Sequence, residues 1–237
     1  MKHILLIATG GTIASRPTED GLAPQLCAED ILGCVPALAS LCSALQLLNI
    51  DSTNMAPDHW LTIAECVKEN YFRYDGFVIT HGTDTMSYTA CALSYLIQNS
   101  AKPIVLTGAQ KPMVFENTDS KTNLADAFRV AASDLCGVMI VFNGRVILGT
   151  RARKTHTTSL QAFSSINFPE LAVLRDDVVL SYIRPEPEGP VRFYDALNTR
   201  VALLKLTPGG GREVLDFLLE HNDALIIESF GVGGLPC

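Results

Sequence analysis

Two short segments of the sequence combine threonine hydroxyls with glycine. Residues 8–15 read Ala-Thr-Gly-Gly-Thr-Ile-Ala-Ser, and residues 79–85 read Ile-Thr-His-Gly-Thr-Asp-Thr. A threonine hydroxyl becomes a nucleophile when a base takes its proton. Lys154, which opens the run Lys-Thr-His-Thr-Thr, is a candidate base beside a carboxylate, and glycine-rich turns offer backbone N–H groups to an oxyanion. These groups suit acyl transfer from an amide or ester, although Thr12 alone would read as a turn residue that bonds its own backbone.

Other common site motifs do not occur in the sequence. Gly10-Gly11 does not extend into the Gly-x-Gly-x-x-Gly dinucleotide pattern, and there is no phosphate-binding Gly-Lys-Thr/Ser loop or Gly-x-Ser-x-Gly elbow. The five histidines show no metal-ligand spacing, so His81 is interpreted as a positioning or core residue. The sequence therefore predicts a site that uses neither a metal nor a cofactor.

The composition limits the class of protein. A chain of 237 residues that is 48% hydrophobic can bury a large core, and its net charge of −7 argues against nucleic acid or an anionic membrane as partner. No apolar run reaches the roughly 20 residues that span a bilayer. The apolar start of the chain runs into the Thr-Gly-Gly motif rather than a cleavage site, and the seven cysteines form no Cys-x-x-Cys pair. We therefore expect a cytoplasmic protein with reduced cysteines.

Strand-like and helix-like patterns alternate along the chain. Short runs rich in Ile, Val and Leu suit strands covered on both faces, and segments with apolar residues at helical spacing separate them. This alternation predicts a doubly wound, mostly parallel α/β sheet with right-handed crossovers. The expected strands are 4–8, 45–50, 76–80, 103–107 and 137–142, and the expected helices are 58–71, 84–98 and 120–133.

Small hydroxyl and amide residues follow each of the first four expected strands. The clusters are Thr9 to Thr12, Asp51-Ser52-Thr53, Thr80 to Thr85, and Thr107-Gly108-Ala109-Gln110. The carboxyl ends of parallel strands meet at one edge of a sheet, where ligands bind. We therefore expect the four clusters to form one site.

The composition changes after the fifth strand. The proline-rich stretch from Arg184 to Pro190 cannot continue a helix or a sheet, and residues 201–206, 212–220 and 224–228 then form another strand–helix–strand pattern. We expect an N-terminal α/β catalytic domain at residues 1–183, a linker at 184–200, and the incomplete beginning of a smaller C-terminal α/β domain at 201–237.

The segments Thr9–Ala14 and His81–Met86 resemble the two sequence hallmarks of the bacterial-type L-asparaginase family, which includes the mixed glutaminase-asparaginases. The resemblance follows the whole chain in order and is strongest to the cytoplasmic type I members, since no signal peptide is found. It implies an N-terminal asparaginase-like domain that hydrolyses L-asparagine to L-aspartate and ammonia. It also implies assembly into a homodimer or homotetramer.

The resemblance further implies roles for individual residues. Thr12 would be the nucleophile that forms the acyl-enzyme, and a second group would relay its proton. The proton relay would consist of Thr83, Asp84 and Lys154. Asp84 would also bind the α-ammonium group of the substrate, Ser52 would bind its α-carboxylate, and Asp51 and Thr53 would line the pocket. The backbone N–H groups of Thr83 and Ala109 would hold the oxyanion.

The sequence departs from the family in two respects. Residues 16–21 resemble the mobile lid of family members, but the matching stretch at 20–24 lacks the tyrosine that many members carry, so that role stays unassigned. The family continues for roughly 100 further residues as a second domain, whereas this chain stops at Cys237. We therefore expect a truncated or incomplete member.

Three alternatives accompany the asparaginase interpretation. The first is a catalytically impaired module that binds an amino acid through Asp84 and Ser52 without turnover. The second is mixed specificity, because one methylene changes discrimination by only about 1–3 kcal/mol. The third, a transamidation subunit that feeds ammonia toward a tRNA-bound glutamate, is disfavoured: that class carries an extra N-terminal domain, and eight residues precede the Thr-Gly-Gly motif here.

Overall fold

The computed structural model describes residues 2–19, 21–36 and 42–235. It divides the chain into two compact units, Met1–Asp195 and Ala196–Cys237. The first unit contains the strands and helices expected up to residue 142 and all the candidate site residues.

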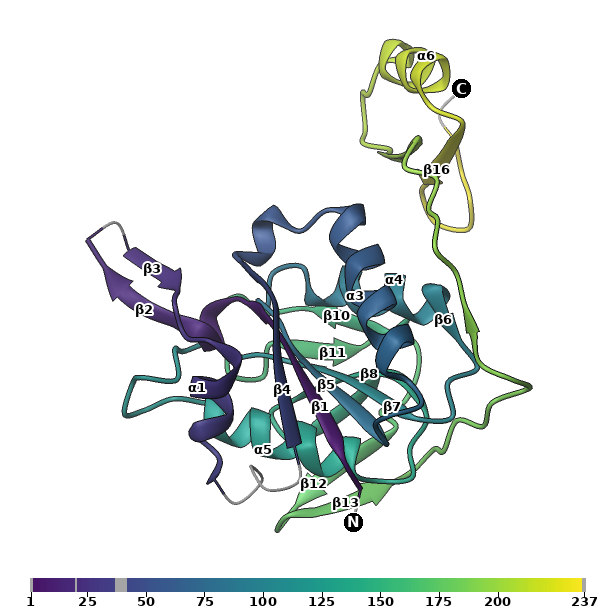
Figure 1. The fold of residues 1–237 in the computed structure, drawn as a ribbon. Coiled ribbons are helices and arrows are strands. Elements are labelled where there is room, and N and C mark those ends of the chain that lie inside the picture. The colour runs from purple at the N-terminus through teal and green to yellow at the C-terminus, as the bar shows by residue number, and fades with distance from the viewer. Residues whose placement is uncertain (1, 20, 37–41, 236–237) are drawn as a thin grey trace. The chain divides into compact units, whose positions relative to one another are not determined.

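An eight-stranded sheet organises the first unit, in the order β13-β12-β9-β8-β7-β5-β1-β4 (Figure 1). The strands from β8 to β4 are parallel, and the other three extend the sheet in antiparallel fashion. This arrangement confirms the predicted mostly parallel α/β sheet. The parallel strands are β1 (Ile4–Gly10), β4 (Cys42–Ile50), β5 (Gly76–Thr80), β7 (Pro103–Thr107) and β8 (Gly137–Phe142). The antiparallel strands are β9 (Arg145–Leu148), β12 (Ala172–Arg175) and β13 (Val178–Ser181).

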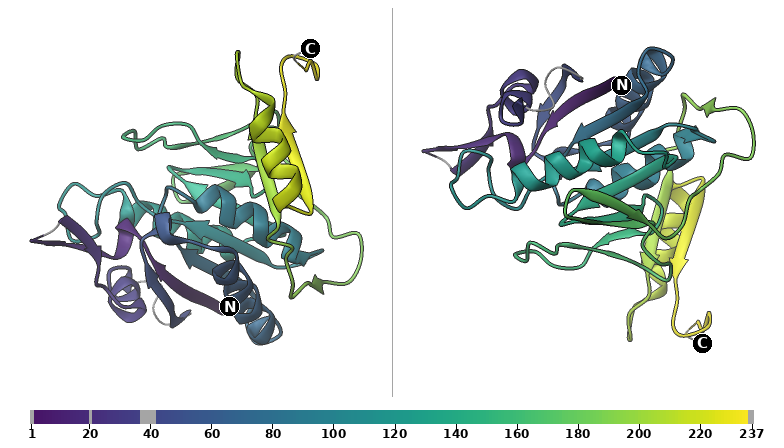
Figure 2. Two further views of the ribbon diagram at one scale, coloured as in Figure 1. Left: turned by 90° about the horizontal axis from the view of Figure 1, so that it is seen from above. Right: turned by 90° about the horizontal axis from the view of Figure 1, so that it is seen from below.

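Helices cover both faces of the sheet (Figures 1 and 2). Alternate residues of each strand belong to different core clusters: Leu6 and Val78 pack with α1 (Ala28–Gly33) and α5 (Ser120–Ala131). Their neighbours Ile7 and Ile79 pack with α3 (Pro57–Asn70) and α4 (Met86–Leu96). Burying each such side chain contributes about 1.5–3 kcal/mol, so both cores hold the strand ends in fixed positions.

The helix expected at 84–98 is shorter at both ends. It begins at Met86, after a non-helical Thr85, and the side chains of Asp84 and Thr85 bond to Lys154 and to the Ser52 carbonyl. At the other end, Ile97–Gln98 form β6, which pairs with β14 (Arg192–Phe193) inside the stretch expected to be a linker.

Two small antiparallel pairs lie outside the main sheet. β2 (Ser15–Thr18) and β3 (Gly21–Pro24) form a hairpin that contains the lid-like residues 16–21. Asp20 lies outside the described residues. β10 (Ala152–Lys154) pairs with β11 (Phe163–Ser165) and carries the candidate lysine.

The second unit consists of one strand–helix–strand element. β15 (Val201–Lys205) and β16 (Ala224–Glu228) are parallel, and α6 (Arg212–His221) connects them. These elements agree with the three segments expected beyond the linker. Among the residues that the structure describes, no helix is both long and apolar enough to cross a membrane. The described cysteines are free thiols, and Cys237 lies outside the described residues.

Candidate active site

Glycines bring the four polar clusters into direct contact at one edge of the sheet. A Cβ atom on Gly11 would lie 2.3 Å from the Gly82 nitrogen, and one on Gly82 would lie 2.5 Å from Ser52 Oγ. A Cβ on Gly108 would lie 2.3 Å from the carbonyl oxygen of His81. Such distances leave no room for a side chain, so the loops that follow β1, β4, β5 and β7 touch only because glycine stands at these positions.

The first loop places Thr12 next to this contact. Gly10 and Gly11 have positive φ angles of 103° and 78°, which turn the chain sharply from β1 into the 3₁₀-helix η1 (Thr12–Ala14). Thr12 therefore directly follows the glycine that packs on Gly82, just as Thr83 directly follows Gly82. Within the described residues, the Thr12 hydroxyl is hydrogen-bonded to neither Thr83 nor Lys154, whereas Thr83 and Lys154 are bonded to each other.

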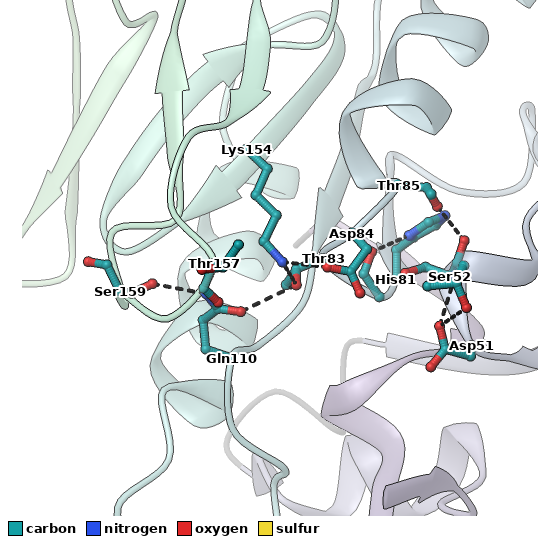
Figure 3. A network of polar contacts seen from close by, with 12 residues as sticks. Asp51, Ser52, His81, Thr83, Asp84, Thr85, Gln110, Lys154, Thr157 and Ser159 are labelled. Atoms are coloured by element: carbon teal, nitrogen blue, oxygen red, sulfur yellow. Dashed lines mark hydrogen bonds and ion pairs between the residues drawn. The ribbon is translucent and has the colours of Figure 1, made fainter.

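Lys154 joins Thr83 and Asp84 in one polar network (Figure 3). Its Nζ donates to Thr83 Oγ1 at 2.8 Å and to Asp84 Oδ1 at 2.7 Å. The side chain of Lys154 is 14% exposed and that of Asp84 is 57% exposed. The ammonium group is therefore mostly removed from water, while the carboxylate retains an open side toward solvent, where a charged substrate group can approach.

Gln110 is a site residue that the sequence pattern placed in a cluster without indicating a role. Its Oε1 accepts from Thr83 Oγ1 at 3.3 Å, and its Nε2 donates to the carbonyl oxygens of Thr157 and Ser159 at 2.9 and 3.0 Å (Figure 3). Gln110 thus ties the loop after Lys154 to the hydroxyl of Thr83. No short-range pattern predicts a contact between residues 47 and 49 positions apart in the chain.

Asn123 and Asp119 hold the fourth loop, which contains Ala109, from behind. Asn123 is 1% exposed; its Nδ2 donates to the Gly108 carbonyl at 3.0 Å and to Asp119 Oδ2 at 3.1 Å. Asp119 also accepts from the backbone N–H of Gln110 at 2.9 Å. Asp119 directly precedes α5, but its side chain makes no N-cap hydrogen bond, and Asn123 lies within the helix, so no local sequence signal indicates either role. Ala109 itself is fully buried, so only its backbone is available to a ligand.

The carboxylate of Asp51 stabilises the loop that follows β4. Asp51 Oδ1 accepts from the backbone N–H and from the Oγ1 of Thr53, both at 2.8 Å, and so caps the 3₁₀-helix η2 (Ser52–Asn54). Ser52 is 2% exposed, and its carbonyl accepts from Thr85 Oγ1 at 2.7 Å. Asp51 and Thr53 are exposed on the surface and bond to each other, while Ser52 packs against Gly82.

His81 is completely buried beneath the third loop. Its Nδ1 is 2.7 Å from the Gly82 carbonyl oxygen, and its Nε2 is 2.8 Å from Thr89 Oγ1. Burial lowers the pKa of His81 to about 4, so the ring is neutral at pH 7. Among the described residues, no group of three or more His, Cys, Asp or Glu side chains could hold a metal ion.

Comparison with known proteins identifies the class of this chain. The family model "Asparaginase, N-terminal" matches residues 3–186. The chain is 40% identical to the L-asparaginase of Thermococcus kodakarensis, over 98% of this chain and 72% of that protein. It is 39% identical to a glutamyl-tRNA(Gln) amidotransferase subunit of Pyrococcus furiosus, over 98% of this chain and 57% of that subunit.

Solved structures agree with the sequence comparison. The thermostable L-asparaginase from Thermococcus kodakarensis superposes with a TM-score of 0.93 and covers 99% of this chain, which in turn covers 73% of that structure. The probable cytoplasmic L-asparaginase from Campylobacter jejuni, at 30% identity, gives a TM-score of 0.86 over 100% of this chain and 76% of that structure. The chain belongs to the asparaginase family.

Proposed function

We propose that this protein hydrolyses L-asparagine to L-aspartate and ammonia through an acyl-enzyme on Thr12. The observation that carries the proposal is the Lys154–Thr83–Asp84 network, which lies at the same sheet edge as Thr12. Membership of the asparaginase family and relatives named L-asparaginase support the choice of substrate.

In the first step, the Thr12 oxygen attacks the amide carbon of the asparagine side chain. The Thr12 proton passes to Thr83 Oγ1, and the Thr83 proton passes to the amide nitrogen, so that the C–N bond breaks and ammonia leaves. Lys154 donates to Thr83 Oγ1 at 2.8 Å and stabilises the partial negative charge that Thr83 carries during this transfer. The step needs no net change in the protonation of Lys154.

In the second step, water attacks the ester carbon of the acyl-enzyme. One proton of the water passes through Thr83 to the Thr12 oxygen, the ester bond breaks, and aspartate leaves. In both steps the backbone N–H groups of Thr83 and Ala109 would donate to the oxyanion, which develops only in the transition state.

Substrate recognition is assigned to the second and third loops. Asp84 uses one carboxylate oxygen for Lys154 at 2.7 Å, and its other oxygen can accept from the α-ammonium group. Ser52, which packs on Gly82, would bind the α-carboxylate, and Asp51 with Thr53 would line the pocket around it.

Ammonia release from L-asparagine and L-glutamine tests the proposal, with Thr12→Ala as the variant. Thr62→Ala is a matched control, because Thr62 lies on α3 and its hydroxyl only bonds the exposed Asp58 carbonyl. Release from asparagine that is lost in Thr12→Ala and kept in Thr62→Ala supports the proposal. Release that persists in Thr12→Ala excludes Thr12 as the nucleophile, and asparagine binding without release makes the protein an amino-acid-binding module. Equal release from glutamine makes it an enzyme of mixed specificity.

A second candidate function is ammonia release for transamidation. The 39% identity to the Pyrococcus furiosus amidotransferase subunit favours it. That function predicts ammonia release which depends on a partner, so hydrolysis by the isolated chain decides against it.

We further propose a cytoplasmic homodimer or homotetramer. The resemblance to type I asparaginases supports this assembly. Light scattering on the purified protein tests the assembly, and a monomer at micromolar concentration would exclude it.

A further inference from the structure

A chain of hydrogen bonds runs from α3 through α4 to the loop that carries Thr83. The Trp60 indole Nε1 donates to Thr89 Oγ1 at 3.0 Å, Thr89 Oγ1 lies 2.8 Å from His81 Nε2, and His81 Nδ1 lies 2.7 Å from the Gly82 carbonyl oxygen. Thr89 and His81 are both fully buried. The sequence pattern gave His81 no specific contact and Thr89 no role in the chemistry.

The two ends of this chain fix the direction of every bond in it. A carbonyl oxygen only accepts, so His81 Nδ1 must carry the proton that bonds the Gly82 carbonyl. A neutral imidazole has one N–H, which leaves Nε2 as an acceptor, and Thr89 must donate its hydroxyl proton to it. The Thr89 oxygen is then free to accept from Trp60, whose indole nitrogen only donates. His81 is thereby held as the Nδ1–H tautomer.

The bond from His81 orients the peptide group between Gly82 and Thr83. The carbonyl and N–H of a trans peptide point in opposite directions across one plane. Because the Gly82 carbonyl points into the buried His81 ring, the Thr83 N–H points the opposite way within the peptide plane, away from His81. Within the part of the chain that the structure describes, no hydrogen bond uses the Thr83 N–H, so it is available to a ligand.

Glycine at position 82 makes such an orienting bond necessary. Ser52 packs so closely on the Gly82 Cα that a side chain has no room there. Glycine, however, has wide freedom in its backbone angles, so sterics alone do not stop this peptide from turning its carbonyl outward. The His81 ring supplies the missing restraint, since it is itself fixed by Thr89 on α4.

We propose that His81 is a positioning residue for catalysis, which aims the Thr83 N–H at the oxyanion by holding the Gly82 carbonyl, with Thr89 and Trp60 fixing its tautomer. This inference rests on the proposed function, because it assigns the Thr83 N–H to the oxyanion of amide hydrolysis. His81 contacts no reacting atom and acts only through the peptide that follows it.

Steady-state kinetics with L-asparagine test the effect of the bond. In His81→Leu the Gly82 carbonyl loses its donor, whereas in His81→Asn the side-chain amide carries an N–H group near the position of Nδ1. Loss of a whole oxyanion donor lowers kcat by about 10²–10³-fold. We expect a loss of about 10–100-fold in His81→Leu with KM within about twofold of wild type, and recovery of most of kcat in His81→Asn. A wild-type kcat in His81→Leu would overturn the proposal. It would also be overturned if His81→Leu and His81→Asn both lost kcat and aspartate affinity to the same extent, because that pattern indicates general damage to the site.

Nitrogen NMR of the histidine rings tests the tautomer without any dependence on turnover. In ¹⁵N-histidine-labelled wild-type protein at pH 7, we expect the His81 ring to carry its proton on Nδ1, with the signal assigned by its absence in His81→Asn. A proton on Nε2, or an imidazolium ring, would refute the proposal even if His81→Leu does not fold. Failure of the proposed function is recognised separately, since wild-type protein would then release no ammonia while the NMR result still stands.

Discussion

Acid is expected to destabilise the first unit through His81. The perturbation is a change from pH 7.5 to pH 5, applied to the wild-type protein and to His81→Asn, which cannot titrate at this position. The folded state keeps the ring neutral because burial lowers its pKa from 6.5 to about 4, whereas the unfolded chain exposes it to water. Between these values the unfolded state binds more protons than the folded state, so stability is complete above pH 6.5 and falls as the pH decreases toward 4.

The size of the effect follows from the two pKa values. The difference between them corresponds to a loss of about 3 kcal/mol once the pH lies below both, of which about 2 kcal/mol is already lost at pH 5. Relative to His81→Asn, the unfolding free energy of the wild type should therefore fall by about 1 kcal/mol per pH unit between pH 6 and pH 4.5.

Urea unfolding read by tryptophan fluorescence measures this difference. Trp60 is the single tryptophan of the sequence, and it bonds to Thr89 next to His81, so the signal reports on the first unit. Carboxylates titrate in both proteins and cancel in the comparison. A stability difference between wild type and His81→Asn that does not change from pH 7.5 to pH 5 would refute the assignment of a buried, neutral His81.

Three other substitutions test the loops around the site. Gly11→Ala should lower the urea-unfolding free energy by about 3 kcal/mol or more, because the new Cβ would lie 2.3 Å from the Gly82 nitrogen. Gly33→Ala is the control and should be neutral or slightly stabilising, because no atom lies within 4 Å of a Cβ at that position. Lys154→Met should reduce ammonia release at least about 100-fold with an unchanged Tm, and retained activity would remove it from the proton relay. Asn123→Leu should cost about 3 kcal/mol in thermal or urea unfolding, because three of its partners lose a hydrogen bond, and an unaltered midpoint would contradict this role.

The parallel strands could be predicted from the sequence because they are buried on both faces. Continuous runs of Ile, Val and Leu locate β5, β7 and β8 at their observed ends. No strand is predicted for residues 143–183, where β9, β12 and β13 extend the sheet, although Asn143-Gly144 is a strong hairpin signal. Both residues have positive φ angles, 49° and 70°, and they turn the chain into β9.

The candidate site could be predicted only where its residues adjoin a strand end. The polar clusters after β1, β4, β5 and β7 mark the sheet edge, because parallel topology fixes where those ends meet. Gln110, Asn123 and Thr89 could not be given roles in the same way, since each acts through a partner set by tertiary packing. The bonds from Asp84 and Thr85, just before α4, likewise reach loops distant in the chain.

The ion pair between Lys154 and Asp84 joins residues 70 positions apart in the chain. Closing a loop of this length costs conformational entropy, which the contacts that the loop makes must repay. The β10 segment that brings Lys154 belongs to a two-stranded pair outside the main sheet, but Phe163 of its partner strand β11 is buried in the core and packs on Phe142 of β8. Because Lys154 pairs directly with Phe163, the position of the catalytic ammonium group depends on the same core that holds the sheet together, and denaturant should abolish turnover at the concentration that unfolds the sheet.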